Sequence, residues 1–142
     1  MVDILRYLHE YADRVHHPRE DVAFARLARH SPDMKATLDR LHQEHRVIET
    51  AGADLLARIE AAAGGEVVAR EKIEAAAATF LVFYESHLAR EENEVLARAG
   101  KLLTAADWDA VRASVPALPD PVFGKDPQER FRELRRQIAR ES

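Results

Sequence analysis

The chain has 142 residues, of which 46% are hydrophobic and 32% charged, with no cysteine and a formal net charge of -4. This length fits one domain with a sizeable core, and interspersed charges of both signs give no electrostatic footprint for nucleic acid. The lack of cysteine excludes disulfides, thiolate nucleophiles and iron–sulfur or cysteine–zinc sites, so a bound metal has to be held by nitrogen and oxygen atoms.

The composition favours helices over sheet, because alanine, leucine, glutamate and arginine dominate and only five glycines are present. Hydrophobic periodicity predicts three long helices, over about 3–29, 34–62 and 67–99, with breaks at HSPD (30–33) and AAGGE (62–66). Thr104 is a good N-cap for a short helix, and a last helix is expected over 127–140. The predicted fold class is all-α, an up-and-down bundle of three long helices with short C-terminal ones.

Residues 1–115 are predicted to form this bundle, and residues 116–142 a proline-rich linker and a C-terminal helix that packs on the bundle or on a partner subunit. Asp126 and Pro127 are the expected N-cap and first residue of that helix. No apolar run approaches the roughly 18 residues of a membrane span, and the N-terminus lacks the basic start of a signal peptide. We therefore expect no membrane contact and a cytoplasmic location.

An apolar stripe along the second predicted helix passes through His45. The stripe, at alternating three- and four-residue steps, consists of Leu38, Leu41, His45, Ile48, Gly52, Leu55 and Ile59. Because a helix turns such a stripe toward the core, His45 is predicted to face the bundle interior. Gly52 has no side chain and lets a neighbouring helix approach closely, whereas His42 lies beside the stripe.

The third predicted helix places a histidine and a carboxylate where apolar residues are expected. Its stripe runs through Ile73, Ala77, Phe80 and Tyr84 and continues with His87 and Glu91. A carboxylate at such a position needs a compensating partner. Glu94, seven residues after His87, returns to the same face.

The first predicted helix repeats this pattern with His16 and Glu20. These two residues lie along the buried side marked by Leu5, Leu8, Ala12, Val15, Phe24 and Leu27. His9 precedes His16 by seven residues and shares its face. Pro18 removes a backbone hydrogen bond, so a kink is expected at this motif.

Two carboxylates buried in one bundle call for a cation, because an ionised carboxylate without a partner is too costly to bury. A histidine and a carboxylate at i and i+4 put two donor atoms on one helix face, so two such helices and His45 can converge on one or two metal ions. Ligands of this kind suit iron, manganese or zinc. Each motif alone also has a structural explanation, as a core histidine, a helix start or a solvated face. Their coincidence on three helices favours a metal site.

The segments HHPRED (16–21), QEHR (43–46) and HLAREE (87–92) resemble the hemerythrin HHE cation-binding family, and LTAADW (103–108) resembles its continuation. The similarity covers most of residues 1–115 and implies a hemerythrin-type bundle that binds one or two iron ions. The ligands that the resemblance implies are His16, Glu20, His45, His87 and Glu91, with Glu20 and Glu91 in the positions that bridge two irons.

Members of that family usually begin with one more helix, which bears a further histidine ligand, and this chain is expected to lack it. The gap can be filled by the C-terminal helix or by a second subunit, and the missing ligand can be replaced by His9. Three long amphipathic helices left open expose a large apolar surface, which favours a homodimer.

The resemblance implies a binding module rather than an enzyme, namely a non-haem iron protein that binds or senses oxygen, nitric oxide or peroxide, or that handles iron. The enzyme alternative is a ferritin-like di-iron oxidase or peroxidase, but its Glu-x-x-His motifs are replaced here by Asp13-x-x-His16 and Asp39-x-x-His42. The structural alternative is a metal-free helical oligomerisation or regulatory domain. The residues leave open which metal binds, how many ions, and which ligand reaches them.

Overall fold

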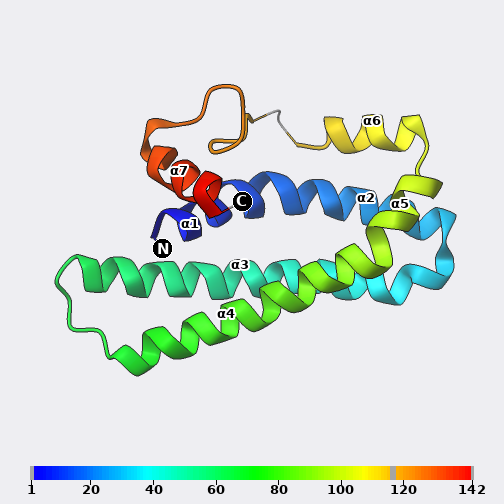
Figure 1. The fold of residues 1–142 in the computed structure, drawn as a ribbon. Helices are drawn as coiled ribbons and strands as arrows, with labels where there is room; N and C mark the ends of the chain where they lie inside the picture. Colours follow the sequence, from blue (N-terminus) through cyan, green and yellow to red (C-terminus); the bar gives the residue numbers. More distant parts are fainter. Residues whose placement is uncertain (1, 116–117, 142) are drawn as a thin grey trace.

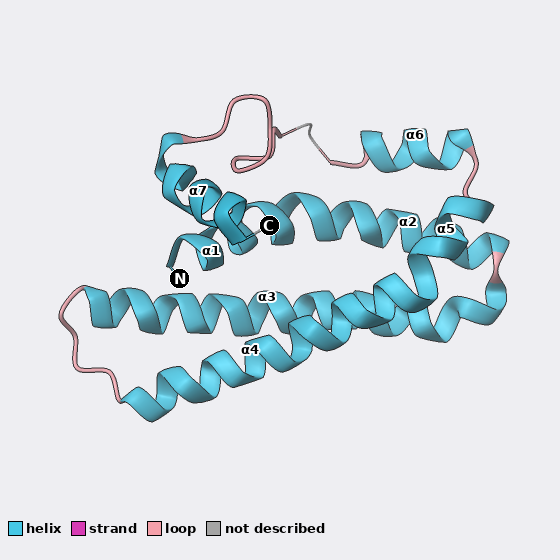
Figure 2. Ribbon diagram, in the orientation of Figure 1, coloured by secondary structure: helices cyan, strands magenta, loops and turns pink. Residues whose placement is uncertain are grey.

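The computed structural model describes residues 2–115 and 118–141, and every regular element among them is helical (Figure 2). Three long rods dominate, and a shorter layer of helices lies along the first rod (Figure 1). The prediction of an all-α bundle is confirmed. No helix in the described part of the chain combines the length and the apolar character that crossing a bilayer requires.

The rods correspond to the three predicted long helices. The first consists of α1 (Val2–Tyr7), the π-helical segment η1 (Leu8–His16) and α2 (His17–His30). After the 3-10 turn η2 (Pro32–Met34), the second rod is α3 (Lys35–Ala63), and the third consists of α4 (Arg70–Arg90), the π-helical segment η3 (Glu91–Val95) and α5 (Leu96–Leu102). The shorter elements are α6 (Ala105–Ala113), the 3-10 turn η4 (Glu129–Phe131) and α7 (Arg132–Glu141).

The breaks between these elements follow local backbone chemistry. The chain turns after α3 at Gly65, whose φ of 92° favours glycine. Thr104 caps α6 through a capping box with Asp107, as its sequence position predicted. The last helix begins later than expected, because Gln128 is extended and its N–H donates to the carbonyl oxygen of Pro121. The predicted domain boundary at 115/116 adjoins residues 116–117, which lie outside the described residues.

Two π-helical segments shift the inward face of the rods by one residue. The N–H of His17 donates to the carbonyl of Ala12, and that of Leu96 to the carbonyl of Glu91, five residues back in each case. A π-turn holds more residues than an α-turn, so a later residue arrives at a given face. The expected disturbance near Pro18 thus takes the form of a widened helix that ends just before the proline.

The core is divided into two apolar clusters along the rods. One cluster joins α2, η2, α3, η3, α5 and α6 and contains Ala23, Phe24, Leu27, Met34, Leu38, Leu41, Val95, Ala99, Leu103 and Val111. The other joins α1, α3 and α4 and contains Leu5, Ile48, Leu55 and Phe80. On each rod, the inward histidine lies in the sequence between residues of one cluster and residues of the other.

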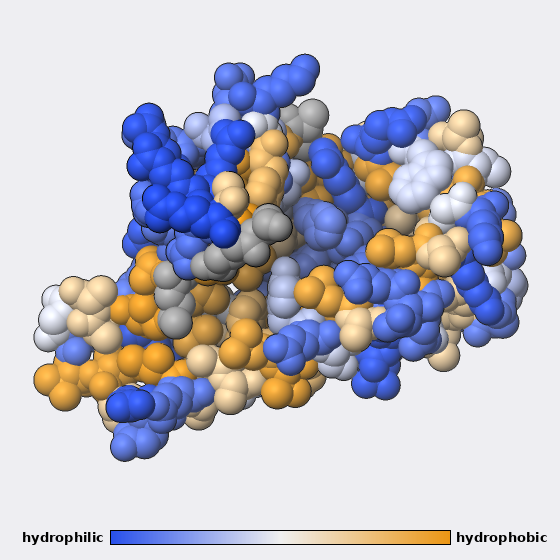
Figure 3. Space-filling view, viewed as in Figure 1, coloured by the Kyte–Doolittle hydropathy of each residue, from blue (hydrophilic) through white to orange (hydrophobic). Residues whose placement is uncertain are grey.

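The C-terminal segment packs on α1. Val122, Phe131 and Leu134 are buried together with part of Tyr7, and the Tyr7 hydroxyl donates to Asp120 at 3.1 Å. Arg130 pairs with Glu10 on the first rod. The Arg-rich outer side of α7 is hydrophilic in Figure 3, whereas apolar side chains gather over the far ends of α3 and α4 at the lower left.

Gly52 lets α4 approach α3, as the sequence predicted. A Cβ atom at Gly52 would lie 3.0 Å from the ring of Phe80, which is buried. Gly100, in α5, has no atom within 4 Å of its Cβ position.

We expect Gly100→Ala to stabilise the protein by up to about 1 kcal/mol, because alanine has the higher helix propensity. Gly52→Ala has the same gain in helix propensity, but its Cβ atom crowds the ring of Phe80. This variant should therefore be less stable than Gly100→Ala by about 1–3 kcal/mol. Urea denaturation of both variants measures the difference. Equal stabilisation by the two changes would show that Phe80 does not limit the α3–α4 distance.

Candidate metal centre

Three imidazoles from the three rods meet in the interior. His17 from α2 stacks on His45 from α3, with ring centroids 4.3 Å apart. His87 from α4 meets His45 edge-on at 4.7 Å. All three rings are buried, and only 1% of His87 is exposed.

Two carboxyl groups border these rings. Glu20 lies one turn after His17, and its Oε2 atom is 3.5 Å from Nε2 of His45. Each of four residues, His17, Glu20, His45 and His87, offers one ligand atom, and these atoms all lie within 4.8 Å of one another. Glu91 lies next to this group, with its Oε2 atom 3.8 Å from Nε2 of His87.

Several inward atoms have no hydrogen-bond partner within the described part of the protein. These buried atoms include Oε2 of Glu20, Nε2 of His45 and Oε1 of Glu91. A buried oxygen or nitrogen lone pair without a donor costs free energy, so such atoms are expected to bind a proton or a cation. The donor set of imidazole and carboxylate, without sulfur, fits iron, zinc or manganese.

The two carboxyl groups respond to burial in opposite directions. Burial and the negative charge of Glu20 raise the pKa of Glu91 well above its ordinary value. Burial is the largest single effect on Glu20 and disfavours its charge, but the hydrogen bond and charge of His16, the hydrogen bond with Glu91 and the charge of His17 together lower the pKa of Glu20. Without a cation, burial and the charge of Glu20 therefore favour the protonated, neutral form of Glu91.

His87 is an uncharged imidazole near neutral pH. Burial, followed by the neighbouring His45 and His17 rings, lowers the pKa of His87 to about 4. A neutral imidazole is the form that binds a metal ion, so the site requires no deprotonation of this residue.

The structure corrects the predicted inward face of the first rod by one residue. The side chain of His16 is 60% exposed and touches Glu20 from outside, with its Nε2 atom 2.7 Å from Oε1. The group of potential ligands contains His17 in its place. The physical reason is the π-helical segment η1, because an α-helical period would have turned His16 inward.

The other predicted site residues are mostly buried at the centre, with two exceptions. His45, His87 and Glu91 are buried, as their stripes indicated, and Glu20 is a member of the group. His9 is not a member of the group, and its Nδ1 atom lies 3.3 Å from Oδ2 of Asp13. Glu94 is exposed. Because η3 is π-helical, Val95 takes the inward position that an α-helix would give to Glu94.

The sequence left the role of His17 open between a replacement ligand, a hydrogen-bond donor to a ligand and a surface group, and it did not identify three carboxylates behind the rings. Asp13, Asp21 and Glu44 contact His17, His45 and His87, respectively. The spacing His9, Asp13, His17, four residues at each step, was a readable signal for one of these contacts. The contact of His45 with Asp21 joins α2 to α3 and had no local signature.

Comparison with known families gives one match, to the model of the hemerythrin HHE cation binding domain, over residues 1–99. That range covers most of the chain and holds all the residues of the group. The chain belongs to the hemerythrin HHE family. No curated protein and no solved structure matched it in the corresponding searches. The short helices α6 and α7 lie beyond the part of this HHE domain that the family model covers.

We expect His17→Ala to weaken metal binding by at least the roughly 10–100-fold that loss of a ligand's supporting partner costs. His16→Ala should cost less, because that ring lies outside the group. Competition titrations with a chromophoric chelator measure the metal affinity of each variant. A larger loss for His16→Ala would show that the register of the first rod is that of a regular α-helix.

A second prediction concerns the pH dependence of the metal-free protein. Above the ordinary pKa of 4.5, unfolded Glu91 releases a proton that the native state retains, so the free energy of unfolding falls as pH rises. The lowered pKa of His87 makes the free energy of unfolding rise with pH, but only below the ordinary histidine pKa of 6.5. The raised pKa of His16, like that of Glu91, makes the free energy of unfolding fall as pH rises.

Melting temperatures of the metal-free protein should therefore fall from pH 6.5 upward, and Glu91→Gln should reduce this fall. Glu85→Gln, an exposed change on α4, is the matched control and should leave the slope unchanged. A slope that Glu91→Gln does not alter would place the retained proton elsewhere.

Proposed function

We propose that this HHE domain is a non-haem iron protein whose centre is formed by His17, Glu20, His45, His87 and Glu91. The observation that carries the proposal is the convergence of three buried rings and a carboxylate within 4.8 Å, with inward atoms that lack partners. The family match supports cation binding. His16 is the ligand that the resemblance had implied, and it stays next to the centre through Glu20.

Glu20 and Glu91 are proposed to serve one or two ions. Their carboxyl groups contact each other, and each approaches an inner ring. A carboxylate between two helices is the usual way in which a helical bundle holds a pair of irons. Bound iron would supply reversible electron transfer and an open position for a small ligand.

An apolar cleft leads to these carboxylates and supports a small ligand such as oxygen, nitric oxide or peroxide. Its volume is about 200 Å³, and its walls come from α2, η3, α5 and α6. Phe24, Leu96, Trp108 and Val111 line it, with Glu20 and Glu91 among its polar residues. Apolar walls admit small uncharged molecules and disfavour hydrated ions.

Two further expectations belong to this proposal. We infer a cytoplasmic protein that forms a homodimer. Exposed apolar side chains on α4, among them Leu81, Val82 and Phe83, support a subunit interface. The C-terminal helix fills part of the first rod's outer side but brings no histidine.

The test is the metal content of protein purified without chelator, together with absorption spectra before and after exposure to air. Anaerobic titration with Fe²⁺ should raise the melting temperature, because a ligand that binds only the native state stabilises it, by about 2.7 kcal/mol at 100 times its Kd. One or two irons per chain is the expected stoichiometry.

The alternatives give different results in the same experiment. A ferritin-like oxidase would consume Fe²⁺ or peroxide over many turnovers, whereas a binding protein gives one event per centre. A metal-free oligomerisation or regulatory domain would show no change of melting temperature with Fe²⁺ or with chelator. That last result would refute the proposed metal centre.

A further inference from the structure

Each inner imidazole presents its Nδ1 atom to a carboxylate outside the group. The distances are 2.8 Å from His45 to Oδ1 of Asp21, 3.2 Å from His17 to Oδ1 of Asp13, and 3.6 Å from His87 to Oε2 of Glu44. The three carboxylates sit on different elements, and each faces Nδ1 of its ring. Nδ1 of His87 and Oε2 of Glu44 have no hydrogen-bond partner among the described residues, so the closer contacts are those of His45 and His17.

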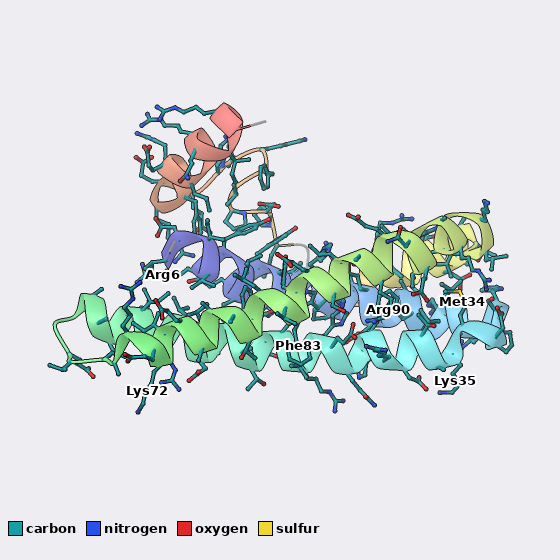
Figure 4. All side chains as sticks on the ribbon, turned by 60° about the horizontal axis from the view of Figure 1, so that its bottom comes forward. Arg6, Met34, Lys35, Lys72, Phe83 and Arg90 are labelled. Atoms are coloured by element: carbon teal, nitrogen blue, oxygen red, sulfur yellow. The ribbon has the colours of Figure 1, made fainter. Side chains whose placement is uncertain are left out.

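Each of these carboxylates also contacts a second side chain. Oδ2 of Asp13 lies 3.3 Å from Nδ1 of His9, and Oδ1 of Asp21, which contacts His45, also lies 2.8 Å from Nδ1 of His42. Glu44 accepts hydrogen bonds from Nε of Arg40 at 3.0 Å and from Nη1 of Arg90 at 2.5 Å. Arg90, the last residue of α4, is labelled in Figure 4 between the ribbons of α4 and α3. These outer contacts fix the carboxylates in place.

The chemistry of a neutral imidazole then determines which nitrogen faces inward. Such a ring carries one N–H donor and one lone pair, and an ionised carboxylate can only accept. A carboxylate at Nδ1 therefore keeps the proton on Nδ1 and leaves the lone pair on Nε2. In His45, Nε2 is the buried atom without a partner, on the side of Glu20.

We propose that Asp21 and Asp13 are positioning residues that hold His45 and His17 in the tautomer whose Nε2 atom binds the ion. This inference rests on the proposed metal centre. Asp21 has the shortest contact and the one with full hydrogen-bond geometry, so it has the largest effect. Loss of such a partner weakens metal binding by about 10–100-fold.

The deciding variant is Asp21→Asn, which preserves size but can donate an amide N–H to Nδ1 of His45. That donation favours the tautomer with the proton on Nε2, the atom that should bind. Asp39→Asn is the matched control, since Asp39 is exposed and paired with Lys35. Affinity for Zn²⁺ is measured by competition, and the ¹⁵N shifts of the metal-free protein report the tautomer of His45, assigned with His45→Ala.

We expect Asp21→Asn to bind Zn²⁺ about 10–100-fold more weakly and to move the His45 proton to Nε2, with Asp39→Asn unchanged in both. Weaker binding with an unchanged tautomer would overturn the inference, as would binding equal to wild type. If Asp21→Asn does not fold, Asp13→Asn applies the same test to His17. Absence of Zn²⁺ and Fe²⁺ binding by the wild type would refute the metal centre, while the ¹⁵N shifts would still decide the tautomer.

Discussion

The rest of the structure depends on the burial of charged and polar groups between two apolar clusters. Glu20 and Glu91 border three buried imidazoles, and the energetic cost of burying an unpaired carboxylate there is large. In the metal-free protein the raised pKa of Glu91 favours its neutral form, and His16 lies beside Glu20. A bound cation would compensate the charge of both carboxylates, and Glu91 would then need no proton.

Much of this fold follows from the sequence. The three rods, the turn at the paired glycines, the cap at Thr104 and the close packing at Gly52 all come from local rules and helical periodicity. The inward positions of His45 and His87 follow from the same periodicity, because α3 and α4 are regular α-helices up to the centre. Regular geometry makes a sequence pattern a reliable guide to a face.

Two parts of the site were beyond that guide. An α-helical period assigns His16 and Glu94 to the interior, and the π-helical segments replace them by His17 and Val95. Such segments depend on where neighbouring rods and buried groups meet, which no local pattern states. The contact between Asp21 and His45 likewise depends on how α2 lies against α3. Spacing within one helix could reveal only the Asp13 contact.

The distribution of satisfied atoms separates a metal centre from a polar core. A structural cluster of histidines would be expected to satisfy its atoms on every side. Here the outer nitrogens of His17 and His45 have carboxylate partners, whereas inward atoms of His45, Glu20 and Glu91 have none among the described residues. His87 does not follow this distribution, because its outer Nδ1 atom, 3.6 Å from Oε2 of Glu44, also has no hydrogen-bond partner among the described residues. A ligand that approaches from the inside and draws the rings together would complete both sides at once, and a multivalent cation has the required charge and position.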